Sequence, residues 1–153
     1  MKIVGIDSST KKTGMSLFFD GALSRYVLID NSKMTDKDAR IDRMMLDICN
    51  ELEEWKPDIV YQEDTWLGRN AETDQMLCSL VGAVRYWCAS HGCEYHKIKP
   101  VTWRATVGLD PKAKREDAKR ESVEFVLEKY NAAVGDDVAD AICVGLAGVM
   151  YKE

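Results

Sequence analysis

Residues 1–17 read MKIVGIDSSTKKTGMSL, an apolar segment that ends in one carboxylate and turns directly into a second extended segment. Lys2 to Ile6 is rich in β-branched residues, which predicts a strand buried in the middle of a sheet. Asp7 comes directly after this strand, at a position where its side chain should still be buried. A buried carboxylate that is neither paired nor hydrogen-bonded costs on the order of several kcal/mol. Asp7 is therefore expected either to cap the turn or to hold a metal ion.

The next segments predict an antiparallel meander followed by a crossover. Residues 8–12 form a short polar turn, residues 13–19 a second strand and residues 23–29 a third. Apolar residues at helical spacing predict a helix over 36–55, and the following strand, 59–63, again ends in a carboxylate, Glu63. If this strand runs parallel to the first, Asp7 and Glu63 lie at one edge of the sheet.

The rest of the chain completes an α/β pattern. The remaining predicted elements are a helix over about 71–91, a strand over 94–98, a short helix over 99–107, a helix over 114–130 and a last helix from about 135 to 151. We predict one domain over 1–153, a mixed five-stranded sheet flanked by helices, in which strands 1–3 are an antiparallel meander and strands 4 and 5 are parallel.

Charge is distributed unevenly along the chain. The formal net charge is −5, but residues 97–120 hold eight basic and three acidic side chains, a local balance of +5, so the remainder carries −10. A basic segment beside an acidic pocket is what a nuclease needs, although a solvated helix face explains the same count equally well. Because no targeting peptide or membrane-spanning run is visible, we expect a cytoplasmic protein with no membrane partner.

The start of the last helix supplies two more carboxylates. Asp137 and Asp140 are three residues apart and share one helix face, and Asp136 is expected at the N-cap. Asp140 lies in an Ala-rich apolar stretch that should press against the sheet. Together with Asp7 and Glu63, these acids predict an oxygen-ligand site for Mg²⁺ or Mn²⁺.

Five cysteines are spread mainly through apolar helical patterns, which favours reduced core thiols over a disulfide framework. One group offers the ligand types of a zinc site, namely Cys88, His91, Cys93 and His96. The spacing differs from that of common zinc motifs, and placement on a helix end and a strand with alternating faces is favoured instead.

These motifs together resemble RuvC-type Holliday junction resolvases, which have the RNase H-like fold. The resemblance covers nearly the whole chain and rests on residues 3–7 with Thr13-Gly14, on the strand that ends in Glu63 and on Asp137-x-x-Asp140. Smaller phage-borne members are the nearest comparison, which would place the protein in a host cytoplasm. Many family members have Pro-Gly after the first acid, whereas this chain has Ser8-Ser9.

The resemblance implies a function and its participants. The protein would be a crossover junction endodeoxyribonuclease that acts as a homodimer on four-way or branched DNA, nicks two strands symmetrically and leaves 5′-phosphate ends. Two Mg²⁺ ions, or Mn²⁺ in their place, would be held by Asp7, Glu63, Asp137 and Asp140, with Lys114 assisting catalysis and no nucleotide cofactor. The DNA-binding residues would be Trp66, stacking on a base, with Arg69, Arg104, Lys112, Lys114 and Arg115 at the backbone.

Two other functions remain open from the sequence. Four acids do not select the substrate, so an RNase H-like nuclease that cuts RNA or an RNA–DNA hybrid is the second hypothesis. The third is a non-catalytic DNA-binding module in which the acids are structural. Cleavage assays with an Asp7→Asn variant and with different substrates distinguish the three.

Overall fold

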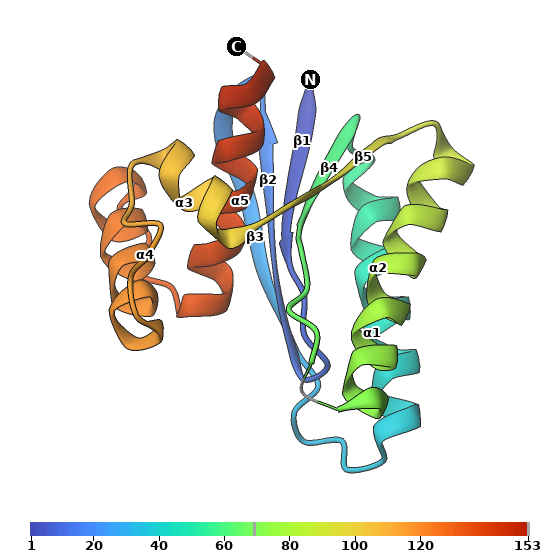
Figure 1. The fold of residues 1–153 in the computed structure, drawn as a ribbon. Coiled ribbons are helices and arrows are strands. Elements are labelled where there is room, and N and C mark those ends of the chain that lie inside the picture. The colour runs from blue at the N-terminus through green and yellow to red at the C-terminus, as the bar shows by residue number, and fades with distance from the viewer. Residues whose placement is uncertain (69, 153) are drawn as a thin grey trace.

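The computed structural model describes residues 1–68 and 70–152. A single five-stranded sheet lies between two helical layers, with α1 and α2 on one face and α5, joined by α3 and α4, on the other (Figure 1). The strands are β1 (Lys2–Asp7), β2 (Lys12–Phe19), β3 (Ala22–Asp30), β4 (Ile59–Glu63) and β5 (Glu94–Ile98). The helices are α1 (Lys37–Trp55), α2 (Ala71–His91), α3 (Pro100–Val107), α4 (Arg115–Tyr130) and α5 (Asp136–Lys152).

The sheet has the order β3-β2-β1-β4-β5. β1, β2 and β3 pair antiparallel, whereas β4 pairs parallel with both β1 and β5. This confirms the predicted mixed sheet, with the meander at one side and the parallel strands at the other. Since β4, which follows α1, runs parallel to β1 beside it, the carboxyl ends of these two strands meet at one edge.

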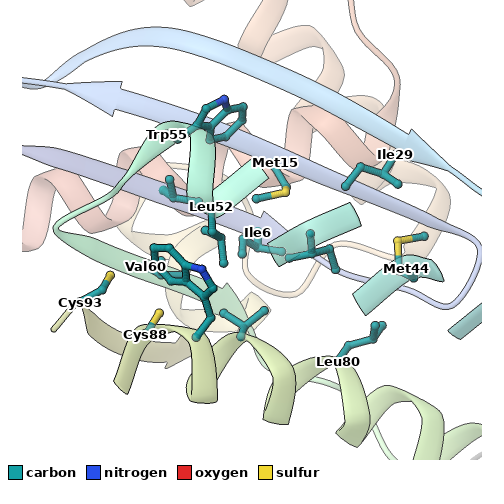
Figure 2. Packing of buried hydrophobic residues seen from close by; sticks show 14 of the residues in the cluster. Ile6, Met15, Ile29, Met44, Leu52, Trp55, Val60, Leu80, Cys88 and Cys93 are labelled. Atoms are coloured by element: carbon teal, nitrogen blue, oxygen red, sulfur yellow. The ribbon is translucent and has the colours of Figure 1, made fainter. Parts of the chain in front are cut away.

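Side-chain alternation along the strands produces two separate cores. Val4 and Ile6 of β1 face α1 and α2, where they belong to one core with Met44, Leu52 and Leu80. Figure 2 shows Ile6 among these helix residues. Ile3 and Phe18 face the opposite layer and pack with the apolar side of α5. Odd-numbered residues of β1, Asp7 included, therefore belong to the α5 face of the sheet.

Small residues let α5 approach the sheet very closely. A Cβ atom at Gly5 would collide with the backbone of Ala141 and Gly145, and one at Gly145 would collide with Phe18. The Ser16 hydroxyl on β2 donates a 2.7 Å hydrogen bond to the carbonyl oxygen of Ala141. The buried helix that begins with three acids is thereby held directly against the two central strands.

The helix termini agree with the predicted boundaries except at one cap. Asp36 caps α1 by accepting a 3.0 Å bond from the Ala39 amide. At α5 the N-cap expected at Asp136 is wrong, because the amide of Ala139 donates to the Gly135 carbonyl and Asp136 already lies in the first turn. Among the helices that the structure describes, none combines the length and apolarity needed to cross a membrane.

Candidate active site

The first two acids lie on adjacent strands at the same edge. Ile6 is paired in register with Gln62 across the parallel β1–β4 ladder, so Asp7 and Glu63 are the next residues along their strands. Both belong to the face of the sheet that α5 covers. Ile3, four residues before Asp7, and Tyr61, two residues before Glu63, pack in that core, and side chains two residues apart on a strand share a face. The predicted juxtaposition of the two strand-end carboxylates is confirmed.

The helix brings its acids to the same place. Gly14 pairs with Asp7 in the β1–β2 ladder, and a Cβ atom at Gly14 would collide with the backbone of Asp137. The first turn of α5 therefore rests on the strand beside Asp7. Asp140 follows on the same helix face, and its Oδ1 atom is buried without a hydrogen-bond partner in the part of the chain that the structure describes. An orphaned buried carboxylate oxygen is a position that a cation would satisfy.

Electrostatic interaction joins these carboxylates. Burial raises the pKa of Asp7 well above its ordinary range, and the charges of Glu63, Asp140 and Asp137 raise it further, in that order. Burial also raises the pKa of Glu63 to about 7, with Asp140 as the next cause. Hydrogen bonding from Trp103 opposes that increase. The edge of the sheet therefore holds more buried negative charge than the protein neutralises.

Burial also raises the pKa of the two acids on α5, Asp137 and Asp140. Burial raises the pKa of Asp140 to about 6, while the Ser122 hydroxyl beside it acts in the opposite direction. Asp137 has a raised pKa because of burial and the neighbouring charge of Asp136. Like charges in a poorly solvated place are the usual reason why carboxylates titrate near neutral pH.

The donor set suits a hard cation, but the side chains do not surround one. Carboxylate oxygens are what Mg²⁺ and Mn²⁺ prefer. Within residues 1–68 and 70–152, no three acidic, histidine or cysteine side chains converge as a formed coordination shell. The four carboxylates interact through their charges, so holding a cation would require them to turn toward it. The ligand type, the unpartnered Oδ1 atom of Asp140 and the unbalanced charge fit such an ion.

The possible zinc group is not assembled in the described chain. His91 stacks on Trp87 with ring centroids 4.1 Å apart and contacts Glu53 at 2.6 Å through its Nε2 atom. His96 stacks on Tyr61 at 5.0 Å. All five cysteines are free thiols. Cys88, Cys93 and Cys143 are buried, whereas the expectation of a core position is wrong for Cys78, which is exposed.

Arg104 differs from its predicted role. Its side chain is 6% exposed, and its guanidinium donates to the Asp110 carbonyl at 2.8 Å and to the Glu121 carboxylate at 2.9 Å. The expectation that Arg104 contacts the DNA backbone is wrong for this structure, because its donors are directed into the protein. The buried guanidinium instead ties α3 to the loop before α4 and to α4 itself. Its positive charge opposes the rise in the pKa of Glu63 and Asp140.

The other predicted DNA-contacting residues are at the surface where the structure describes them. Trp66 is 66% exposed in the loop that follows β4. Lys112, Lys114 and Arg115 are exposed before and at the start of α4. Arg69 lies outside the described residues. The roles of these side chains stay predictions.

Two interactions at the site were not foreseen. Trp103 donates its indole N–H to Glu63 Oε2 at 2.7 Å. Gln62, which is fully buried, donates to the Ser8 hydroxyl at 3.0 Å and accepts from the Tyr95 hydroxyl at 2.8 Å. A glutamine inside an apolar strand was a signal for such a network. Ser8, which stands where the resembling family has proline, is thus held by a residue next to Glu63.

The chain is similar to one family of known proteins over nearly its whole length. The family model described as crossover junction endodeoxyribonuclease RuvC matches residues 3–148. A relative of that name from Caldicellulosiruptor saccharolyticus is 21% identical and covers 100% of this chain and 98% of its own length. Another, from Syntrophomonas wolfei, is 26% identical and covers 95% of this chain and 87% of its own length. RuvC of T. thermophilus in complex with a Holliday junction substrate is similar in fold, with a TM-score of 0.79, 18% identity and coverage of 99% and 94%. Fowlpox virus resolvase in complex with Holliday junction DNA has a TM-score of 0.68 at 14% identity, covering 99% of each chain.

Proposed function

Because the chain belongs to the RuvC family of crossover junction endodeoxyribonucleases, we propose that it is a metal-dependent endonuclease that resolves four-way or branched DNA by paired nicks. The observation that carries this proposal is the cluster of buried carboxylates at the β1–β4 edge, where Asp140 Oδ1 has no partner in the described chain. Its expected place of action is the cytoplasm, of a host cell if the gene is phage-borne.

Each residue has a proposed part in the reaction. Asp7, Glu63, Asp137 and Asp140 would hold two Mg²⁺ ions, for which Mn²⁺ can substitute. Bound there, the ions would supply an activated water for attack on the phosphorus and stabilisation of the leaving 3′ oxygen. Lys114, with Lys112 and Arg115, would hold the phosphate backbone and offset its charge. Trp66 would stack on a base exposed at the branch point.

Two active sites are needed to cut two strands, and this proposal therefore includes a homodimer. Each chain carries one carboxylate cluster, and a two-fold dimer presents two related clusters to a two-fold symmetric junction. The layer formed by α1 and α2 lies opposite α5 and exposes large apolar side chains, Leu46 at 56% and Tyr86 at 76%. These residues support an interface on that layer. Sedimentation analysis of the free protein tests it, and a monomer at all concentrations, with or without a junction, would contradict it.

The decisive experiment is cleavage of an immobile four-way junction with Mg²⁺ by wild type and Asp7→Asn. The variant should lose cleavage while retaining junction affinity, because it removes a metal ligand and no DNA contact. Glu128→Gln, which changes an exposed acid on α4, should cleave normally. Products of the wild type should carry 5′ phosphates.

Substrate comparison separates the remaining functions. We expect the four-way junction or a flap to be cut faster than an RNA–DNA hybrid. Preference for the hybrid would replace the proposed substrate with an RNA-containing one. Absence of metal-dependent cleavage on all of these substrates, with junction binding intact, would identify a binding module.

A further inference from the structure

Trp103 of α3 contacts the carboxylate cluster. It is 1% exposed and belongs to the core beneath α5. Pro100 occupies the first turn of α3, and the Trp103 amide donates a 3.0 Å bond to the Lys99 carbonyl, so the residue sits on a regular first helical turn. From there the indole N–H reaches Glu63 Oε2 at 2.7 Å.

We propose that Trp103 is a positioning residue for the cation site, which sets the orientation of the Glu63 carboxylate through this hydrogen bond. The proposal rests on the proposed function, since it takes Glu63 as a ligand. Carboxylates that bind metals are themselves commonly oriented by hydrogen bonds, and loss of such a partner typically weakens metal affinity about 10–100-fold.

The geometry suits that task. The indole has a single donor and no acceptor, so it fixes one carboxylate oxygen and leaves Oε1 for a cation. Because the ring is buried and fills its site, its rotation is restricted and the position of the N–H is defined by packing. The Arg104 guanidinium carbon lies 5.4 Å from the centre of the same ring. Trp103 is therefore held between the apolar core and the guanidinium of Arg104, which is itself fixed by its hydrogen bonds.

The competing interpretation is that Trp103 only fills the core. The chain supplies a matched control in Trp55, which is 3% exposed in the core on the other face of the sheet. Its indole Nε1 is buried and has no hydrogen-bond partner among the residues that the structure describes. Replacing either tryptophan with phenylalanine removes the same atoms, but only Trp103→Phe removes a bond to a carboxylate.

The experiment measures Mn²⁺ binding to the intact protein by calorimetry without DNA, alongside thermal unfolding in EDTA. Trp103→Phe should raise the Kd for Mn²⁺ by about 10-fold or more, and the Mn²⁺ concentration for half-maximal cleavage should rise with it. Trp55→Phe should keep the wild-type Kd whatever its effect on Tm. A Trp103→Phe variant with wild-type Kd, or equal weakening in both variants, overturns the proposal.

A measurement on the wild-type protein covers the case in which Trp103→Phe does not fold. The four indole N–H signals in a ¹⁵N spectrum can be assigned by replacing Trp55, Trp66 and Trp87 in turn with phenylalanine. On titration with Mg²⁺ the Trp103 signal should shift with saturation and the Trp55 signal should not. An unchanged Trp103 signal at saturating Mg²⁺ overturns the proposal. If the wild type binds neither Mg²⁺ nor Mn²⁺, the proposed function fails as well. If the wild type binds metal and cleaves normally and Trp103→Phe does the same, only the role of Trp103 is refuted.

Discussion

Glu63→Gln is predicted to stabilise the metal-free protein at alkaline pH and to leave its stability unchanged at acidic pH. The pKa of Glu63 rises from its ordinary 4.5 to about 7 in the fold, mainly because of burial and then of Asp140. Between these values the folded protein keeps a proton that the unfolded chain releases. The free energy of unfolding of the wild type therefore falls as pH rises through this window, and the cost is fully developed above pH 7.

The difference between the two pKa values of Glu63 corresponds to a loss on the order of 3 kcal/mol in the free energy of unfolding of the wild type at pH 8. Glutamine stays neutral in both states and its amide oxygen can still accept the Trp103 bond, so the variant avoids this cost. The same change relieves Asp7, whose pKa is raised in part by the Glu63 charge. For a domain of this size, about 3 kcal/mol corresponds to an increase in Tm of roughly 6–12 °C.

Thermal unfolding in EDTA from pH 4.5 to pH 8 measures this effect. The difference between variant and wild type should be near zero at pH 4.5 and grow toward pH 8. Glu128→Gln removes an exposed acid from α4 and should show no such trend. Adding Mg²⁺ at pH 8 should raise the Tm of the wild type more than that of the variant. A gain that does not vary with pH, or a variant less stable than wild type at pH 8, would refute the electrostatic reasoning.

Three further changes test the packing and the surface. Gly5→Ala should destabilise the protein by more than about 2 kcal/mol in denaturant unfolding, since the added methyl collides with the backbone of α5; near wild-type stability would contradict the close contact. Glu121→Gln should cost on the order of 3 kcal/mol at pH 7, because it leaves the buried Arg104 without its carboxylate, and unchanged stability would show that the carbonyl acceptors suffice. Trp66→Ala should weaken junction binding, measured by fluorescence anisotropy, by roughly 1–3 kcal/mol if one base stacks on it; unaltered affinity would remove Trp66 from the proposed interface.

The sequence by itself determined the order of elements and the meeting of Asp7 with Glu63. Two apolar strands each end in an acid, and the second follows directly after an amphipathic helix, which favours a parallel pair. Parallel pairing places both carboxyl ends at one edge. The small and apolar residues of the last helix likewise predicted that it would lie buried against the sheet. These features depend on local patterns, which are visible along the chain.

Tertiary structure alone decided what surrounds the acids. A count of basic residues cannot distinguish a solvated arginine from Arg104, whose carboxylate partner is 17 residues away on another helix. Nothing near Trp103 in the sequence indicated that its indole would reach Glu63, 40 residues earlier. Hydrogen bonds and charge pairs between distant segments depend on how helices dock on the sheet, and that docking is set by the packing of the whole core rather than by the period of any one element.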